Sequence, residues 1–199
     1  LHIQKPTPLY HKVIGAKERI TASGQIIRTL DKEHIKNALQ NAKATGIDAI
    51  AICLVHGYIH QKHEAYIEGI AKDLGFADVT TSHKIAPLIK LVPRAQTCLI
   101  NAYLNPVLQH YISKLSDNIS STPLYFMQSN GGLAHKDHFI AKDAILSGPA
   151  GGIIGAVETA RLSGFDKIIT FDMGGTSTDV SHFAGQLEFN SNASVSGQK

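Results

Sequence analysis

Hydrophobic residues recur along the chain with two periods, one typical of strands and one typical of helices. Residues 1–20 alternate weakly and carry two prolines, so we expect an extended segment that ends in an edge strand. A Ser-Gly turn and a second short strand within residues 21–30 predict a hairpin with that strand. A helix is expected to follow from Asp31, a favoured N-cap residue, to Gly46, a typical C-terminal glycine; Ile35, Leu39 and Ala42 lie at helical spacing between them.

The next segments alternate between strand and helix patterns. Residues 47–58 form a nearly unbroken apolar run, which predicts a strand buried on both faces, as in a parallel sheet. Residues 62–75 return to the helical period, and residues 77–85 predict another strand. This order of helix, strand, helix and strand favours the α/β class.

The second half of the chain opens with its longest helical pattern, residues 94–118. Pro106 lies inside it and predicts a kink or a division into two helices. Residues 123–132 predict a strand that runs into an Asn-Gly-Gly turn, and residues 147–164 predict a helix. The block 167–189 predicts two antiparallel strands joined around Gly174 and Gly175, of which the first, over residues 167–171, is expected to be buried.

Composition narrows the class of protein. The 199 residues are 43% hydrophobic, which excludes intrinsic disorder, and no apolar window reaches the ~18 residues that a membrane span needs. A net charge of +3, evenly spread, argues against nucleic acid or an anionic membrane as partner. Cys53 and Cys98 lie in apolar patterns, so we expect buried, reduced thiols in a cytoplasmic protein. The chain has no signal-peptide pattern at its start and does not begin with Met, so we expect it to be part of a longer protein.

The segment Asp172–Asp179 carries the clearest candidate chemistry. Two carboxylates, Asp172 and Asp179, enclose two glycines and three hydroxyl residues. Glycines let backbone N–H groups approach an anion closely, and a carboxylate beside a phosphate has Mg²⁺ as its natural partner. The pattern therefore predicts a site for a phosphate and a magnesium ion, with an ordinary hairpin and an Asp-rich turn as the alternative.

Two other glycine-rich segments could border such a site. Residues 147–152 open a predicted helix, whose first N–H groups and positive dipole end suit an anion. Alternatively, these glycines only permit close packing of the helix against a sheet. Residues 129–132 form a turn at the end of a predicted strand, which makes them a candidate wall of the site.

Three histidines form a cluster in the sequence. His56, His60 and His63 precede Glu64 at a spacing that would align them on one helical face, so a metal site is conceivable. Gly57 and the preceding apolar run instead put His56 at a strand end. A structural or substrate-pocket role is therefore favoured over a metal, and the two cysteines are given no catalytic role.

Taken together, these motifs resemble the hydantoinase A/5-oxoprolinase branch of the actin/hexokinase/Hsp70 ATPase superfamily. One departure is Pro93, where the family usually has a glutamate before the residue that matches Arg94. The resemblance implies a ribonuclease-H-like (actin-like) α/β fold of mixed sheets with flanking helices, in which residues 1–93 end the first half and residues 94–199 begin the second. The matching segments are residues 172–179, 127–133, 146–152, 51–58 with His63-Glu64, Asn101–Tyr103 and Glu18–Ile20.

The resemblance also implies a function. Family members include ATP-dependent amidohydrolases that open cyclic amides such as hydantoin, N-methylhydantoin or 5-oxoproline by phosphorylating the carbonyl oxygen, often with a hydantoinase B-type partner subunit in an oligomer. Asp172 would be the metal ligand for Mg²⁺, and Asp179 would orient hydroxyls or a metal-bound water. ATP would be bound by Gly174, Gly175, Thr176, Ser177, Thr178, Ser147, Gly148 and Gly151.

Two alternatives stay open at this point. The same branch includes subunits of ATP-dependent ketone carboxylases, which act on acetone or acetophenone. The chain could also be a non-catalytic, nucleotide-binding fragment. Because each half of the superfamily fold contributes one phosphate-binding turn, we expect the 199 residues alone to be inactive.

Overall fold

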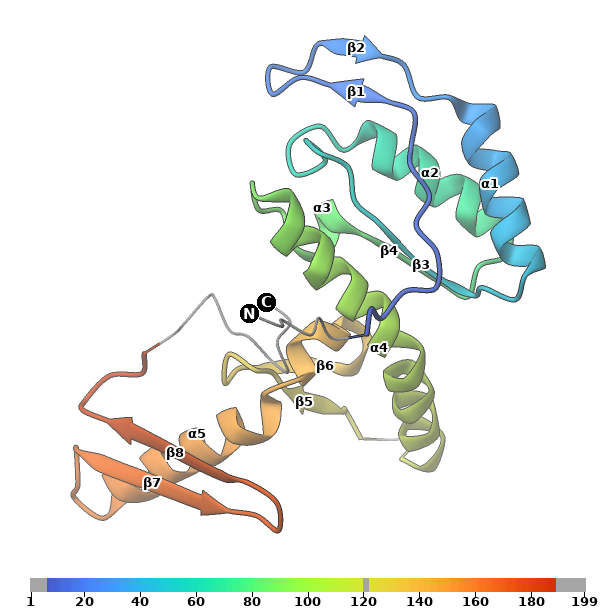
Figure 1. Cartoon of the computed structure of the whole chain (residues 1–199). Coiled ribbons are helices and arrows are strands. Elements are labelled where there is room, and N and C mark those ends of the chain that lie inside the picture. The colour runs from blue at the N-terminus through green and yellow to red at the C-terminus, as the bar shows by residue number, and fades with distance from the viewer. Residues whose placement is uncertain (1–6, 120–121, 189–199) are drawn as a thin grey trace. The chain divides into compact units, whose positions relative to one another are not determined.

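The computed structural model describes residues 7–119 and 122–188 (Figure 1). They divide into two compact units, one ending at His110 and the other starting at Tyr111. This division falls inside the helix α4, Leu91–Asn118. The division at residues 93/94 that the resemblance implies concerns sequence regions rather than compact units, and it stays a prediction.

The first unit begins with the expected hairpin and helix. Strands β1 (Arg19–Ile20) and β2 (Ile26–Arg28) pair antiparallel. Helix α1 (Lys32–Ala44) starts after Asp31, whose carboxylate accepts a hydrogen bond from His34 N at 3.0 Å. Gly46 follows the helix with a φ of +86°, a conformation that favours glycine. Both predicted helix boundaries are confirmed.

A β-α-β motif forms the centre of the first compact unit. Strands β3 (Ala49–Ile52) and β4 (Asp78–Thr81) pair in parallel and are connected through α2 (Lys62–Asp73), which confirms the α/β class. The expected strand over 77–85 is half as long, because its second part forms the short helix α3 (Ser82–Ile85). The core combines side chains of α1, α2, β3 and the adjoining loops: Leu30, Ile35, Leu39, Ala42, Ile52, Ile67, Ala71 and Phe76.

The burial expected for β3 is wrong, and one of the two outcomes expected at Pro106 is excluded. Ile52 is buried in β3, but its neighbour Ala51 is exposed, so β3 is buried on one face rather than two. On that other face α4 contacts the neighbouring strand β4, where Asn101 donates to Thr80 Oγ1 at 3.3 Å and Asn105 donates to Asp78. Helix α4 continues through Pro106 as one helix, which excludes the division into two helices; the other predicted outcome, a kink, stays a prediction.

In the second unit, the described residues after α4 form two hairpins and one long helix. Strands β5 (Tyr125–Met127) and β6 (Leu133–His135) pair antiparallel, as do β7 (Ile168–Met173) and β8 (Thr178–Phe183). Two 3₁₀ turns, η1 (Lys136–His138) and η2 (Ala141–Ala144), precede α5 (Ser147–Leu162). The turn over residues 174–177 therefore joins two antiparallel strands, as predicted.

The expectation that the first strand of this hairpin is buried is wrong for the described residues. Ile169, Phe171 and Met173 alternate along β7 on one face, and all three are exposed. Helix α5 covers the opposite face, where Phe183 is buried and the Arg161 guanidinium lies 5.0 Å from its ring centroid. Within residues 7–119 and 122–188 the strands form four two-stranded sheets rather than one larger sheet. In the same residues, no helix is long and apolar enough to cross a membrane.

Candidate functional site

The Asp172–Asp179 segment is a tight hairpin end. Gly174 N donates to Ser177 O at 2.9 Å, and Asp172 lies directly opposite Asp179 in the β7–β8 ladder. Residues directly opposite each other in an antiparallel pair have side chains on the same face, and like charges in that arrangement repel. Both carboxylates are exposed at the end of the hairpin. The pair is therefore suited to a cation.

The hydroxyl residues of this segment divide between the turn and the strand. Thr176 and Ser177 lie in the turn together with Gly174 and Gly175, while Thr178 begins β8 opposite Met173. Because side chains alternate along a strand, Thr178 lies on the opposite face from Asp172 and Asp179. The structure thus groups the two carboxylates on one face and puts the Thr178 side chain on the other.

The glycine-rich start of α5 lies beside Asp172 of this pair. A side chain at Gly152 would place its Cβ 3.9 Å from Asp172 Oδ2, and one at Gly151 would place its Cβ 3.5 Å from Met127 Cγ in β5. Both distances are ordinary van der Waals contact, so close packing, the alternative interpretation, does not by itself require glycine at Gly151 or Gly152. No atom lies within 4 Å of the Cβ position at Gly148, so close packing does not explain that glycine either.

The first turn of α5 has few side-chain groups that could satisfy its amides. Leu146 is the N-cap residue and offers no side-chain hydrogen bond, and Pro149 has no N–H. The hydroxyl of Ser147 is used elsewhere, since it donates to Ala144 O at 2.8 Å. The first N–H groups of a helix have no intrahelical acceptor, so those of Ser147 and Gly148 are the donors that an anion could use here.

The turn over residues 128–132 contacts the same helix. Gly131 has a φ of +79°, and its Cβ position would lie 3.2 Å from Ile154 of α5, so a glycine is needed for both its conformation and its close contact. Ser129 Oγ donates to Asp143 O at 2.7 Å and accepts from Leu146 N at 3.0 Å. Three motifs that the sequence analysis identified separately therefore meet around the first half of α5.

The donor set fits magnesium held together with a phosphate. Mg²⁺ in such sites uses one or two carboxylates, with waters and phosphate oxygens supplying the other ligands. Asp172 and Asp179 supply two carboxylates in register. Among the described residues, no group of three His, Cys, Asp or Glu side chains could hold a metal ion by itself.

The histidine cluster instead holds the N-terminal segment of the first unit. His63 Nδ1 lies 2.7 Å from Glu18 Oε2, and His60 Nε2 lies 3.0 Å from Ala22 O. His56 lies outside α2, as predicted, but in the loop after β3 rather than at the strand end, and it lines a cavity of about 10 Å³ together with His60 and His63. The metal interpretation finds no support in the described residues, whereas the structural role agrees with these contacts.

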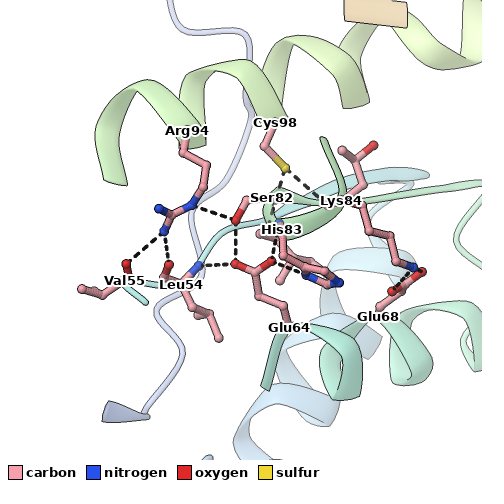
Figure 2. A network of polar contacts seen from close by, with 11 residues as sticks. Leu54, Val55, Glu64, Glu68, Ser82, His83, Lys84, Arg94 and Cys98 are labelled. Carbon is pink, nitrogen blue, oxygen red and sulfur yellow. Dashed lines mark hydrogen bonds and ion pairs between the residues drawn. The ribbon is translucent and has the colours of Figure 1, made fainter. Parts of the chain in front are cut away.

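Sequence analysis missed a buried polar network in the first unit, which Figure 2 shows from close by. Glu64 Oε1 accepts from Leu54 N at 2.8 Å and from Ser82 Oγ at 2.7 Å, while its Oε2 accepts from His83 N at 3.0 Å and lies 2.8 Å from His83 Nδ1. Glu64 and Ser82 have no exposed surface. A charged residue in the first turn of a helix predicts solvent exposure, so the only sequence signal was the His63-Glu64 pair noted in the resemblance.

Arg94 completes this network from α4. Its Nε donates to Ser82 Oγ at 3.0 Å, and its two terminal nitrogens donate to the carbonyl oxygens of Leu54, Val55, Leu88 and Ile89. The guanidinium also lies 5.3 Å from the Tyr58 ring centroid. All of the hydrogen-bond donors of Arg94 are therefore used inside the protein, which indicates a structural role for the residue.

The two cysteines differ in burial. Cys98 has no exposed surface, and its thiol contacts Ile52 O and Thr80 O, whereas Cys53 is only half-buried, so the expectation of two buried thiols is half right. Burial, together with nearby negative charge, raises the pKa of the Cys98 thiol to about 12. A thiol with such a pKa is a poor nucleophile at neutral pH.

Comparison with known proteins agrees with the resemblance of the motifs. Residues 94–199 match the family model described as "Hydantoinase/oxoprolinase", and residues 1–75 match "Hydantoinase/oxoprolinase N-terminal region". The chain is 38% identical to 5-oxoprolinase 1 of Arabidopsis thaliana. The alignment is 212 positions long, gaps included, and covers 94% of this chain and 17% of that protein. The chain thus spans about a sixth of the length of this relative.

Two solved structures are similar in fold. The ATP-dependent caprolactamase of Pseudomonas jessenii aligns with a TM-score of 0.75 and 32% identity, over 83% of this chain and 25% of its own. A nucleotide-free acetone carboxylase aligns with a TM-score of 0.77 and 26% identity, over 86% of this chain and 25% of its own. Since one family model covers more than half of the chain and a second covers most of the remainder, the chain belongs to the hydantoinase/oxoprolinase family.

Proposed function

We propose that the protein containing this chain is an ATP-dependent amidohydrolase that opens a cyclic amide of the hydantoin or 5-oxoproline type. The observation that carries the proposal is the pairing of Asp172 with Asp179 at a glycine-rich turn beside the start of α5. The similarity to an oxoprolinase and a caprolactamase supports a cyclic amide as substrate.

The chemistry explains why such an enzyme needs ATP. An unstrained amide resists water because its carbonyl carbon is a poor electrophile. Transfer of the terminal phosphoryl group of ATP to the carbonyl oxygen would activate that carbon and release ADP. Water would then attack the carbon and the ring C–N bond would break, leaving an acyl phosphate on the ring-opened product. A second water would hydrolyse this acyl phosphate to the free acid and inorganic phosphate.

Each site residue has a proposed part in this reaction. Asp172 is the proposed ligand of Mg²⁺, and Asp179 would orient a metal-bound water or a neighbouring hydroxyl. Bound Mg²⁺ would neutralise charge on the transferring phosphoryl group. The backbone N–H groups of Gly174, Gly175 and Thr176 would contact phosphate oxygens, with Ser177 and Thr178 at the edge of the turn.

The start of α5 would provide a second set of donors. The amides of Ser147 and Gly148 have no acceptor within the helix, and the helix dipole adds positive potential at that end. Gly151 and Gly152 keep this end of the helix free of side chains next to Met127 and Asp172. We propose that these groups bind the phosphates of ATP together with the Asp172–Asp179 turn.

The wider arrangement is also a proposal. In an actin-like ATPase two halves enclose the nucleotide, and residues 94–199 would begin the second half while residues 1–93 would end the first. The 199 residues would then supply only one of two phosphate-binding turns and would be inactive alone. A hydantoinase B-type partner subunit, an oligomeric assembly and a cytoplasmic location, all implied by the resemblance, belong to the same proposal.

A ketone carboxylase is the second candidate, because acetone carboxylase shares the fold of this chain. It would use the same phosphate site but transfer the phosphoryl group to an enolate or to bicarbonate. The proposed phosphate turn over residues 172–179 would serve both reactions.

Phosphate release by the full-length protein tests the proposal. Purified protein is incubated with MgATP and, in separate reactions, hydantoin, N-methylhydantoin, 5-oxoproline, and acetone with bicarbonate. A cyclic amide that increases phosphate release and is itself ring-opened supports the amidohydrolase. Release that needs both ketone and bicarbonate would identify a carboxylase, and release that no substrate changes would contradict both. The 199-residue chain alone is expected to bind MgATP no more tightly than about 1 mM, equivalent to about 4 kcal/mol.

A further inference from the structure

We propose that Ser129 is a positioning residue that holds the start of α5 beside Asp172. The inference rests on the proposed function, since it concerns the same phosphate site. Ser129 belongs to the turn after β5, which sequence analysis identified only as a possible wall of that site.

The contacts of Ser129 are directed at the start of the helix. Both its N–H and its hydroxyl donate to Asp143 O at 2.7 Å, and its Oγ accepts from Leu146 N at 3.0 Å. Leu146 is the N-cap residue of α5 and has no polar side chain of its own. In a capping box, a side chain inside the helix accepts the N–H of the N-cap residue; here Ser129 performs that function from a different segment.

The turn that carries Ser129 is itself rigidly closed. Gln128 N donates to Gly132 O at 2.8 Å, Gly131 N donates to Gln128 O at 2.9 Å, and Gly132 N donates to Asn130 Oδ1 at 2.8 Å. The same turn contacts the helix through Gly131, whose Cβ position lies 3.2 Å from Ile154. Ser129 therefore extends from a fixed frame rather than from a free loop.

The position of α5 matters because the helix is close to the carboxylate. The Cβ position at Gly152 lies 3.9 Å from Asp172 Oδ2, which is van der Waals contact. A shift of about 1 Å at the start of α5 would change the spacing between its amides and Asp172, and misplacements of that size can cost about 100-fold in rate. Ser129 has no charge and would not need to contact ATP to have this effect.

The test compares Ser129→Ala with Ser129→Thr and Ser163→Ala in the full-length protein. Ser163→Ala is the matched control, because Ser163 Oγ also donates to a backbone carbonyl, that of Thr159 at 3.0 Å, but at the other end of α5. Amide exchange over residues 146–150 is measured without nucleotide, and kcat and KM are measured for MgATP and for the amide substrate.

For Ser129→Ala we expect faster exchange over residues 146–150 and a fall in kcat/KM for MgATP of about tenfold or more, with KM for the amide within about twofold of wild type. Ser129→Thr keeps the hydroxyl and should restore both measurements, and Ser163→Ala should match wild type. Unchanged exchange in a folded Ser129→Ala variant would overturn the proposal, as would an activity loss equal to its unfolded fraction.

The remaining outcomes are also decisive. If Ser129→Ala does not fold, a folded Ser129→Thr variant with rapid exchange at residues 146–150 overturns the inference, and one with wild-type exchange and kinetics supports it. If wild type shows no substrate-dependent phosphate release, the proposed function fails. The exchange measurement then still decides whether Ser129 holds the start of α5.

Discussion

Glu64 and Arg94 are both buried in the first unit, and a single hydroxyl joins them. Ser82 Oγ donates to Glu64 at 2.7 Å and accepts from Arg94 at 3.0 Å. The carboxylate and the guanidinium are otherwise surrounded by backbone partners and His83. Two opposite charges thus tie α2, the end of β4 and α4 together at the carboxyl ends of the parallel strands.

Removing either charge from this network should destabilise the protein strongly. Glu64→Gln places an amide among hydrogen-bond donors, and Arg94→Met leaves Glu64 without the compensating charge. Loss of one partner of a buried charged pair costs about 3–5 kcal/mol, which urea unfolding would measure. Glu68→Gln, one turn further along α2, is the control: Glu68 is also buried, but its partners Lys72 and Lys84 are exposed, so this substitution should cost less than Glu64→Gln. Equal effects of Glu64→Gln and Glu68→Gln would contradict the structural role of the network.

Gly57→Ala should be far more harmful than Gly69→Ala. A Cβ at Gly57 would lie 2.1 Å from Glu64 Oε1, so the buried carboxylate would have to move, whereas no atom lies within 4 Å of the Cβ position at Gly69 in α2. We expect Gly57→Ala to cost about 2 kcal/mol or more through disruption of the network, and Gly69→Ala to add about 0.5–1 kcal/mol through helix propensity. Thermal unfolding should therefore show a lower Tm for Gly57→Ala and a higher Tm for Gly69→Ala than for wild type. A neutral Gly57→Ala would show that Glu64 can move without loss.

Asp172→Ala should abolish MgATP-dependent turnover in the full-length protein while leaving folding nearly unchanged. The carboxylate is exposed at a hairpin end, so its contribution to stability is small, but loss of a metal ligand removes several kcal/mol of transition-state stabilisation. Asp166→Ala, at an exposed carboxylate in the loop before β7, is the matched control and should keep wild-type activity. Phosphate release by Asp172→Ala within about threefold of wild type, less than ~1 kcal/mol, would refute the proposed role.

Protonation of Glu68 should lower the stability of the folded protein in acid. Burial raises the pKa of Glu68, but hydrogen bonds and charge attraction from Lys72 and Lys84 outweigh it, so the pKa in the folded protein lies below its ordinary value of 4.5. The resulting stabilisation is complete above pH 4.5 and is lost as the pH falls through the lower, folded-state pKa. Urea unfolding from pH 7 to pH 3 should show a smaller decline for Glu68→Gln than for wild type. Parallel curves for the two proteins would contradict the assignment.

The two thiols should differ in reactivity. Burial is the main cause that raises the pKa of Cys98 to about 12, so its thiolate is scarce at pH 8, and the side chain has no exposed surface. We expect N-ethylmaleimide to label the half-buried Cys53 first and to reach Cys98 only after unfolding. Mass spectrometry of peptides after timed labelling measures both rates, and urea-unfolded protein provides the reference. Equal labelling of the folded protein would mean that the thiol of Cys98 is accessible.

The sequence by itself determined the elements whose stability depends on near neighbours. The Asp31 cap and the glycine after α1 act within one helical turn of their own positions, so their residue types predicted the helix ends. The hairpin around Gly174 and Gly175 was likewise predicted from the apolar segments beside a glycine pair. The Asp172–Asp179 motif needed only its own spacing to indicate a phosphate and metal site, and its role in binding them stays a prediction.

Only the tertiary structure decided which distant residues meet and which surfaces are covered. Glu64, Ser82 and Arg94 lie far apart in the chain, and nothing local shows that folding buries them together. The approach of Gly152 to Asp172 and the link from Ser129 to Leu146 also depend on how α5 packs against two hairpins. The run of hydrophobic residues predicted that β7 is a buried strand. Burial, however, depends on the neighbours that cover a strand, and α5 covers one face of that hairpin only.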